Sequence, residues 1–299
     1  MRTNSGRTAR PTRIGVLVAL AATLAGAGAG GGLEAQGLDS LARRASPDAK
    51  VSVAAGEADL TIVPGDGDRV VVRGRADEMR RLRLDGTPDR VVVRAMEAEE
   101  ALEVRVPRGA EIEARTRSGD LVVRNVSGDL DLESSSGDFR VEGSSGRVRI
   151  EGVSGDVSVD GAPAALRVST VSGDVTARGV TGVVSVTSAS GDVDVSGDRV
   201  SDGSFHSGSG DIRFRGRPAA RASLDFQTAS GDVTIGLPDD VGATYEVTTV
   251  SGDLITDRKA RLTGGEHFGG GRQYELTIGD GGVHVSVQAV SGTVRLGRP

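Results

Sequence analysis

The sequence of 299 residues contains no cysteine. This absence excludes disulfides, thiolate metal ligands, a cysteine nucleophile and a lipid-modified cysteine at a signal cleavage point. Stability must therefore come from packing. Zero cysteine is compatible with an extracytoplasmic location, although it does not establish one.

Large rings are also scarce, since there is no tryptophan and only five phenylalanines and two tyrosines. A core built around aromatic side chains is therefore not expected, and small β-branched residues should fill the interior. The 45 glycines lack the every-third-residue spacing of collagen, while abundant Val and Leu argue against disorder. We expect an ordered chain with many turns.

No long basic run is present, and the 36 basic and 42 acidic residues are interspersed to give a net charge of −6. A protein that follows a phosphate backbone needs clustered positive charge, so nucleic acid is not an expected partner. The mixed charges are typical of a solvated outer face.

The amino terminus has the layout of a secretory signal peptide. Four arginines precede residue 14, an apolar run follows over residues 14–24, and small residues continue to Gly32. The run is too short for a membrane-spanning helix of about 20 residues. Cleavage could follow Ala27, Ala29 or Ala35, and cleavage after Ala35 would make residues 1–35 the signal peptide. We expect an exported protein, periplasmic, on the outer surface or secreted, with no stable transmembrane anchor after cleavage.

A Ser-Gly-Asp tripeptide recurs along the chain, with a nine-residue period between Ser118 and Ser190 and wider spacing afterwards. Gly allows positive φ, while Ser and Asp side chains can bond nearby backbone amides, so each copy is expected to be a structural turn. The complete copies are Ser118, Gly119, Asp120; Ser127, Gly128, Asp129; Ser136, Gly137, Asp138; Ser154, Gly155, Asp156; Ser172, Gly173, Asp174; Ser190, Gly191, Asp192; Ser209, Gly210, Asp211; Ser230, Gly231, Asp232; and Ser251, Gly252, Asp253.

Apolar residues follow each turn in a fixed pattern. The positions three and five residues after each Ser position are apolar in all nine copies from residue 118, degenerate ones included, and the residue between is mostly polar. This alternation predicts strands with one buried face and excludes helix. From Ser154 onward Asp appears in every second copy, which indicates an 18-residue unit of two strands. A meander of antiparallel hairpins is the alternative.

The repeat predicts an all-β fold, a single-domain parallel β-solenoid (β-helix or β-roll) with about 18–21 residues per coil. Residues 36–117 are expected to form an amino-terminal cap and irregular first coils, and residues 118–299 the Ser-Gly-Asp solenoid, continuous with 50–117. The stretch 263–271 is expected to be a protruding loop, and residues 274–296 the final coil.

The order of these elements resembles a bacterial family of uncharacterised proteins labelled putative adhesins. The shared elements are the segment 102–109 before the first Ser-Gly-Asp, the segment 235–238 before 248–253, and Val290-Ser291-Gly292 near the end. The resemblance covers roughly residues 50–299. It implies a Ser-Gly-Asp β-solenoid and supplies no catalytic or binding residues.

Several residue patterns suggest an active site. The Asp residues suggest a calcium roll, but the repeats lack the flanking glycines of G-G-x-G-x-D, and Arg147 interrupts the row. His206, His267 and His284 form no metal-binding motif, and the repeated serines lack a G-x-S-x-G elbow. We expect no cofactor, no metal and no catalytic residue, and hence no enzyme. A carbohydrate-active β-helix enzyme is the enzymatic alternative.

Binding is the remaining class of function. The outward candidates are Arg124, Asp131, Glu133, Arg140, Arg149, Thr176 and Asp194. The expected partner is an unidentified protein or glycan at the cell envelope. The second alternative is a structural scaffold of the envelope that self-associates end to end.

Overall fold

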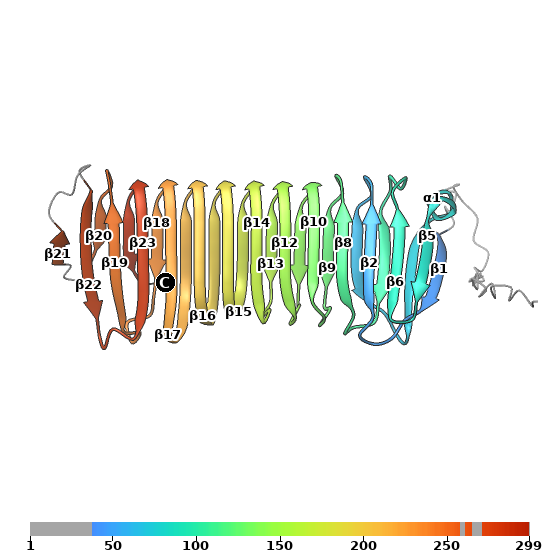
Figure 1. Cartoon of the computed structure of the whole chain (residues 1–299), viewed down its shortest axis with the longest axis horizontal. Helices are drawn as coiled ribbons and strands as arrows, with labels where there is room; N and C mark the ends of the chain where they lie inside the picture. Colours follow the sequence, from blue (N-terminus) through green and yellow to red (C-terminus); the bar gives the residue numbers. More distant parts are fainter. Residues whose placement is uncertain (1–37, 258–260, 265–270, 299) are drawn as a thin grey trace, which may run out of the picture.

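The computed structural model describes residues 38–257, 261–264 and 271–298, and it is an elongated, mostly parallel all-β stack with one short helix (Figure 1). The strands are β1 (Leu38–Arg44), β2 (Lys50–Ala55), β3 (Leu60–Pro64), β4 (Arg69–Arg75), β5 (Arg83–Thr87), β6 (Arg90–Ala95), β7 (Leu102–Val106), β8 (Glu111–Thr116), β9 (Leu121–Arg124), β10 (Leu130–Ser136), β11 (Phe139–Glu142), β12 (Arg147–Ser154), β13 (Val157–Asp160), β14 (Ala165–Ser172), β15 (Val175–Ser190), β16 (Val193–Ser209), β17 (Ile212–Ser230), β18 (Val233–Gly236), β19 (Ala243–Thr249), β20 (Leu254–Thr256), β21 (Arg261–Gly264), β22 (Arg272–Ile278), β23 (Val283–Ser291) and β24 (Val294–Gly297). The helix is α1 (Ala76–Arg81).

Strands in the middle of the stack pair in parallel at a fixed offset. Leu130 of β10 lies beside Ile112 of β8 on one side and Val148 of β12 on the other, an offset of 18 residues each way. The offset widens to 19 between Val193 and Ile212 and to 21 between Ile212 and Val233. The expected repeat of 18–21 residues is confirmed, and parallel pairing excludes the antiparallel meander.

The strands form two layers. Layer 1 runs β6–β2–β8–β10–β12–β14 and then through the second halves of β15, β16 and β17 to β23 and β19. Layer 2 runs β7–β3–β9–β11–β13 and through the first halves of the same long strands to β18, β24 and β20. The three long strands bend from one layer into the other, which makes the hydrogen bonding continuous.

The core lies between the two layers. All eighteen apolar positions expected to point inward, from Leu121 to Val195, are at most 2% exposed. The alternation of buried and exposed residues therefore has the predicted phase. Hydrogen bonding also runs without a break across the predicted division at residues 117 and 118, because β8 pairs with β10 and β9 with β11.

The interior is more aromatic than the composition suggested. Phe139 is buried, and Phe205, Phe214 and Phe226 form a buried cluster with ring centroids 4.9 to 6.1 Å apart. This cluster lies where the repeat lengthens from 18 to 21 residues. A longer repeat encloses a wider interior, which larger side chains must fill to keep native packing density.

The prediction that residues 274–296 form the last coil of the stack is wrong, because the strands near the end of the sequence are not at the end of the stack. β23 lies between β17 and β19, and β24 lies between β18 and β20, so the last strands in sequence occupy an internal position (Figure 1). Ser230 therefore stacks on Ser291, and Gly292 approaches Gly252. β22 lies mostly within the segment 274–296 that is predicted to be the final coil. It instead pairs antiparallel with β19, on the side of β19 that faces away from β23. The predicted loop 263–271 falls mostly outside the described residues, and residues 261–264 form β21.

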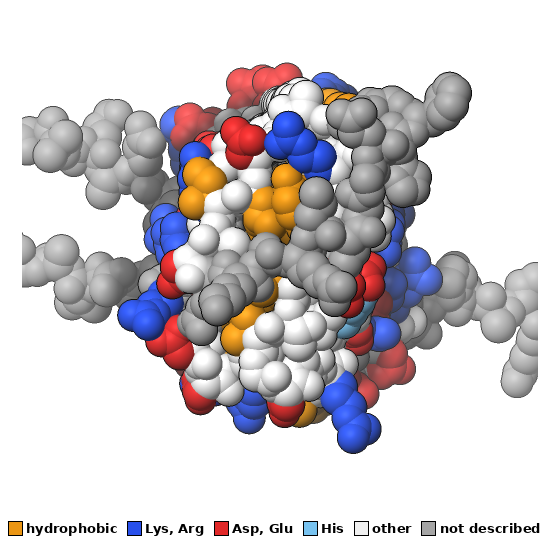
Figure 2. Space-filling view, turned by 90° about the vertical axis from the view of Figure 1, so that its left-hand side faces the viewer, with side chains coloured by type: hydrophobic (Ala, Val, Ile, Leu, Met, Phe, Trp, Pro, Cys, Tyr) orange, Lys and Arg blue, Asp and Glu red, His pale blue; other side chains and the backbone are white. Residues whose placement is uncertain are grey.

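The amino-terminal end repeats this arrangement. β2 and β3 lie between β6/β7 and β8/β9, and antiparallel β1 and β5 close the two layers. α1 lies at this end, with Asp77 and Glu78 in its first turn, where negative charge favours helix. Figure 2 looks onto the opposite end. In its coloured part, charged side chains lie mainly around the rim and uncharged groups toward the middle.

Candidate functional site

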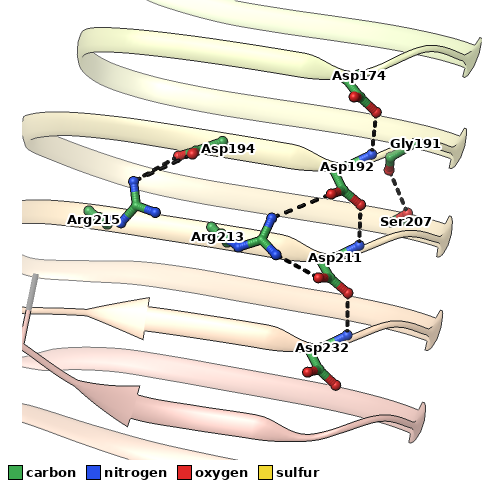
Figure 3. A network of polar contacts seen from close by, with 9 residues as sticks. All are labelled: Asp174, Gly191, Asp192, Asp194, Ser207, Asp211, Arg213, Arg215 and Asp232. Carbon is green, nitrogen blue, oxygen red and sulfur yellow. Dashed lines mark hydrogen bonds and ion pairs between the residues drawn. The ribbon is translucent and has the colours of Figure 1, made fainter.

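The Ser-Gly-Asp turns stack into a column along one edge of the molecule. Each Asp accepts, through Oδ1, a hydrogen bond from the backbone N–H at the same position of the next turn. The N–H of Asp174 donates to Asp156 at 2.9 Å, and that of Asp192 donates to Asp174 at 2.8 Å (Figure 3). The column comprises Asp59, Asp120, Asp138, Asp156, Asp174, Asp192, Asp211 and Asp232, and it ends on the N–H of Thr293. The Asp side chains thus join neighbouring repeats.

The glycines of these turns allow the same close stacking. Gly173 has φ of +119°, and a Cβ there would lie 2.1 Å from the carbonyl oxygen of Gly155. The same contact, at 2.1 to 2.4 Å, recurs from Gly137 through Gly292. No side chain fits between successive turns.

The nine predicted copies do not all lie in this column. Ser127-Gly128-Asp129 turns at the opposite edge, where Arg147 stacks on Asp129 and donates to it from both its backbone and its guanidinium. Gly128 there faces the carbonyl of Ala110. The other eight copies belong to the Asp column or, for Ser251-Gly252-Asp253, extend it beyond Thr293. Successive copies of the nine-residue repeat lie at opposite edges, and the turns form different contacts at each edge. This difference explains why alternate copies lose the motif.

The carboxylates of the column differ in which group contacts their second oxygen, Oδ2. Arg213 bridges Asp192 and Asp211, with nitrogen–oxygen distances of 3.4 and 2.6 Å (Figure 3). Arg295 pairs with Asp232. The hydrogen bond from Arg295, aided by the N–H of Thr293, lowers the pKa of Asp232. Among the described residues, no group of three His, Cys, Asp or Glu side chains could hold a metal ion.

The outward candidates divide between the two layers. Asp131, Glu133 and Arg149 lie on layer 1, whereas the other four lie on layer 2. Several form ion pairs, either with one another, as Arg149 with Asp131 at 3.7 Å, or with a neighbour, as Glu133 with Arg115 at 2.8 Å. Burial raises the pKa of Asp131, whose Oδ1 has no hydrogen-bond partner.

Two of the three histidines lie on the outer face of layer 1, and His267 is outside the described residues. His206 Nε2 lies 3.1 Å from Asp225 Oδ1 and 3.3 Å from Ser204 Oγ. A catalytic triad needs the Asp and the Ser on different ring nitrogens, so that the imidazole is held by one and accepts a proton at the other. Here both contact one nitrogen, and this arrangement does not activate the serine.

Two shallow hollows follow one another across layer 1 close to the Asp column, where Ser169 lies beside Thr187, and because they continue the same two rows of side chains we call them together the groove. Its first wall is a row of outward side chains, one from each of nine adjacent strands, which we call the polar row: Arg115, Glu133, Glu151, Ser169, Thr187, His206, Gln227, Gln288 and Thr248. At about 4.8 Å per strand the row is roughly 40 Å long. The groove therefore follows the long axis of the molecule.

The second wall is formed two residues further along each strand. This small-residue row comprises Ser135, Val153, Val171, Ala189, Gly208, Ala229, Val290 and Val250. Its four valines are 47 to 54% exposed. Between the two walls, the floor is the backbone of residues whose side chains point inward, such as Ser188 and Thr228.

The groove has a charged half and an uncharged half. The half over β8, β10, β12 and β14, with a volume of about 540 Å³, is lined by Arg115, Glu133 and Glu151 among others. The half over β15, β16, β17, β23 and β19 has a volume of about 530 Å³ and contains no Asp, Glu, Lys or Arg. In a chain with 26% charged residues, this uncharged stretch is a distinct surface.

The family model described as Toastrack DUF4097 matches residues 52–236 and 181–297, which together span most of the chain. The chain belongs to this family. The family description names no activity, substrate or partner.

Solved structures similar to this Toastrack DUF4097 chain share little sequence with it. A putative adhesin from Parabacteroides distasonis is 11% identical, with a TM-score of 0.36, over 88% of this chain and 98% of its own. A putative adhesin from Parabacteroides merdae is 10% identical, with a TM-score of 0.29, over 87% and 95%. A putative cell adhesion protein from Clostridium sporogenes is 10% identical, with a TM-score of 0.21, over 88% and 100%. No curated protein matches the chain in sequence.

Proposed function

We propose that this chain is an exported, non-enzymatic β-solenoid that binds an envelope component along the groove of layer 1, in the manner of an adhesin. The observation that supports this proposal is the groove itself, which crosses nine strands in register and presents side chains at a regular spacing. A site of this shape fits a long ligand better than a small substrate, which usually needs a concave pocket with converging polar groups.

Export is proposed from the predicted signal peptide over residues 1–35, which lies outside the described residues. Within the described ranges, no helix has the length and hydropathy needed to cross a membrane. The absence of a catalytic role is proposed from the geometry of Ser204, His206 and Asp225, in which the two oxygens share one ring nitrogen.

The test is co-sedimentation of the mature chain, residues 36–299, with isolated bacterial envelopes. Ala229→Arg places a long charged side chain in the wall of the groove, at an exposed position. Thr176→Arg is the control, because it introduces the same charged side chain at a half-buried position on the outer face of layer 2. We expect wild type and Thr176→Arg to sediment with the envelopes and Ala229→Arg to stay in solution. Equal binding by all three would refute the role of the groove.

A further inference from the structure

We propose that the uncharged half of the groove binds a neutral, linear polysaccharide laid across strands β15, β16, β17, β23 and β19. This inference rests on the proposed function and names the chemical class of the ligand. The first argument is charge. None of the residues that line this half carries a formal charge when His206 is neutral, so a polyanion or polycation would gain no complementary ion pairs there.

The hydrogen-bonding groups of this half suit hydroxyl groups. Asp225 Oδ1 accepts from Gln227 Nε2 at 2.8 Å and contacts His206 Nε2 at 3.1 Å, which fixes both side chains in place. In the neutral imidazole, a donated Nε2–H leaves Nδ1 as an acceptor, and Gln227 keeps Oε1 as an acceptor. The hydroxyls of Thr187 and Thr248 and the amide of Gln288 add donors and acceptors along the same row. Sugar hydroxyls can both donate and accept, and thus match this mixture.

The spacing and the opposite wall fit a sugar polymer as well. Neighbouring members of the polar row are one strand apart, about 4.8 Å, which is close to the length of one pyranose unit in an extended chain. The opposite wall consists of Ala189, Gly208, Ala229, Val290 and Val250, against which the C–H face of a sugar ring can pack. An extended peptide is a poorer fit, because strand addition needs the free backbone of a sheet edge and this surface is a sheet face.

The absence of aromatic rings in the groove has a consequence for affinity. Each sugar unit would gain only a few weak contacts, so binding should depend on the number of units that lie along the groove together. We expect short oligosaccharides to bind undetectably and apparent affinity to rise steeply with chain length.

The test is affinity electrophoresis of the mature chain in gels that contain a neutral linear glucan, a neutral linear mannan or the anionic polymer alginate. Wild type and Thr176→Arg should be retarded by at least one neutral polymer and not by alginate. Ala229→Arg and Gln288→Arg, two exposed positions on different strands, should each lose at least tenfold in apparent affinity, with unchanged circular dichroism. Retardation by alginate alone, or equal retardation of both groove variants and wild type, would overturn the proposal.

A parallel experiment separates the ligand class from the function. Envelopes are treated with periodate, which cleaves vicinal diols of sugars, or with protease, and are then tested for groove-dependent binding. Loss after periodate alone supports a glycan. Loss after protease alone, with binding still blocked by Ala229→Arg, would leave the groove as the binding surface and identify a protein as its partner, which contradicts the polysaccharide.

Discussion

Asp156 lies within the Asp column and tests what the Asp of each turn contributes. Its Oδ1 accepts the N–H of Asp174, and its own N–H is donated to Asp138. Asp156→Asn keeps an acceptor oxygen and should leave stability within about 0.5 kcal/mol. Asp156→Ala removes the acceptor and should cost about 1 kcal/mol. The midpoints of urea unfolding would measure both. If Asn were as costly as Ala, charge and not hydrogen bonding would be the contribution of the column.

Asp129 and Asp131 are two residues apart and are predicted to respond to pH with opposite signs. The hydrogen bond from Arg147 lowers the pKa of Asp129, whereas burial raises that of Asp131. A lowered folded-state pKa contributes stability above the unfolded value, which is lost as pH falls. A raised folded-state pKa costs stability as pH rises through the unfolded value of about 3.9 and above it.

At pH 7, Asp129→Asn should therefore destabilise the protein, and Asp131→Asn should stabilise it. The cost at Asp129 should shrink as the pH falls from about 3.9 through the lowered native pKa, whereas the gain at Asp131 should already shrink as the pH falls through the raised native pKa toward about 3.9. Thermal unfolding of the two variants between pH 3 and 7 would measure this. A less stable Asp131→Asn protein at pH 7 would mean that attraction to Arg149, at 3.7 Å, outweighs the cost of burying the carboxylate.

At the scale of the strands, the out-of-order pair β23 and β24 makes the carboxyl terminus an internal part of the stack. β23 has a partner on each side, β17 and β19, whereas β1 at the other end has β4 as its one partner among the described strands. Deleting residues 283–299 should therefore remove one of the two neighbours of both β17 and β19 and lower protection from β17 through β22. Deleting residues 36–44 should affect only the first strands.

Hydrogen–deuterium exchange of the two truncated chains would measure this difference. Protected amides in β19 and β22 after removal of residues 283–299 would contradict it, because those strands would then have closed directly onto β17. The comparison also bears on folding, since a stack whose last coil inserts between two others cannot be completed by simple end-to-end growth.

The elements that the sequence predicted correctly are determined by residues that lie close together within one repeat. The apolar alternation from Leu121 to Val195 is a local property, and all its inward positions are buried. The order of the last coils is not local. Ser251 and Ser291 carry similar turns, and only long-range pairing determines that Ser291 stacks on Ser230. The contact of His206 with Asp225 was likewise hidden, because it depends on the 21-residue register between the second halves of β16 and β17, which sets Asp225 beside Ser204.

At the scale of the whole molecule, the ends decide between a single binding protein and a self-assembling scaffold. Layer 1 ends in antiparallel strands on both sides, β5 at the amino-terminal end and β22 followed by β21 at the other, and layer 2 ends in β4 followed by β1 at the amino-terminal end. The outer strands are short or carry charges such as Arg43 and Arg83, and these features discourage edge-to-edge pairing. We therefore expect a monomer, roughly 60 Å long at about 4.8 Å per strand.

The end of layer 2 at β20 is the one that favours the scaffold, because it is not covered by a further strand among the described residues. β20 has three residues, and its only partner among the described strands is β24. Ile255 on β20 is 54% exposed, and it lies at the end viewed in Figure 2, where uncharged groups occupy the middle of the coloured surface. If end-to-end assembly occurred through this edge, Ile255→Lys would disrupt it by adding a charge to the contact. Light scattering over a range of concentrations should give a constant monomer mass for both proteins. If wild type forms oligomers and Ile255→Lys is a monomer, the protein is a scaffold. Its functional surface would then be the ends of the stack and not the groove.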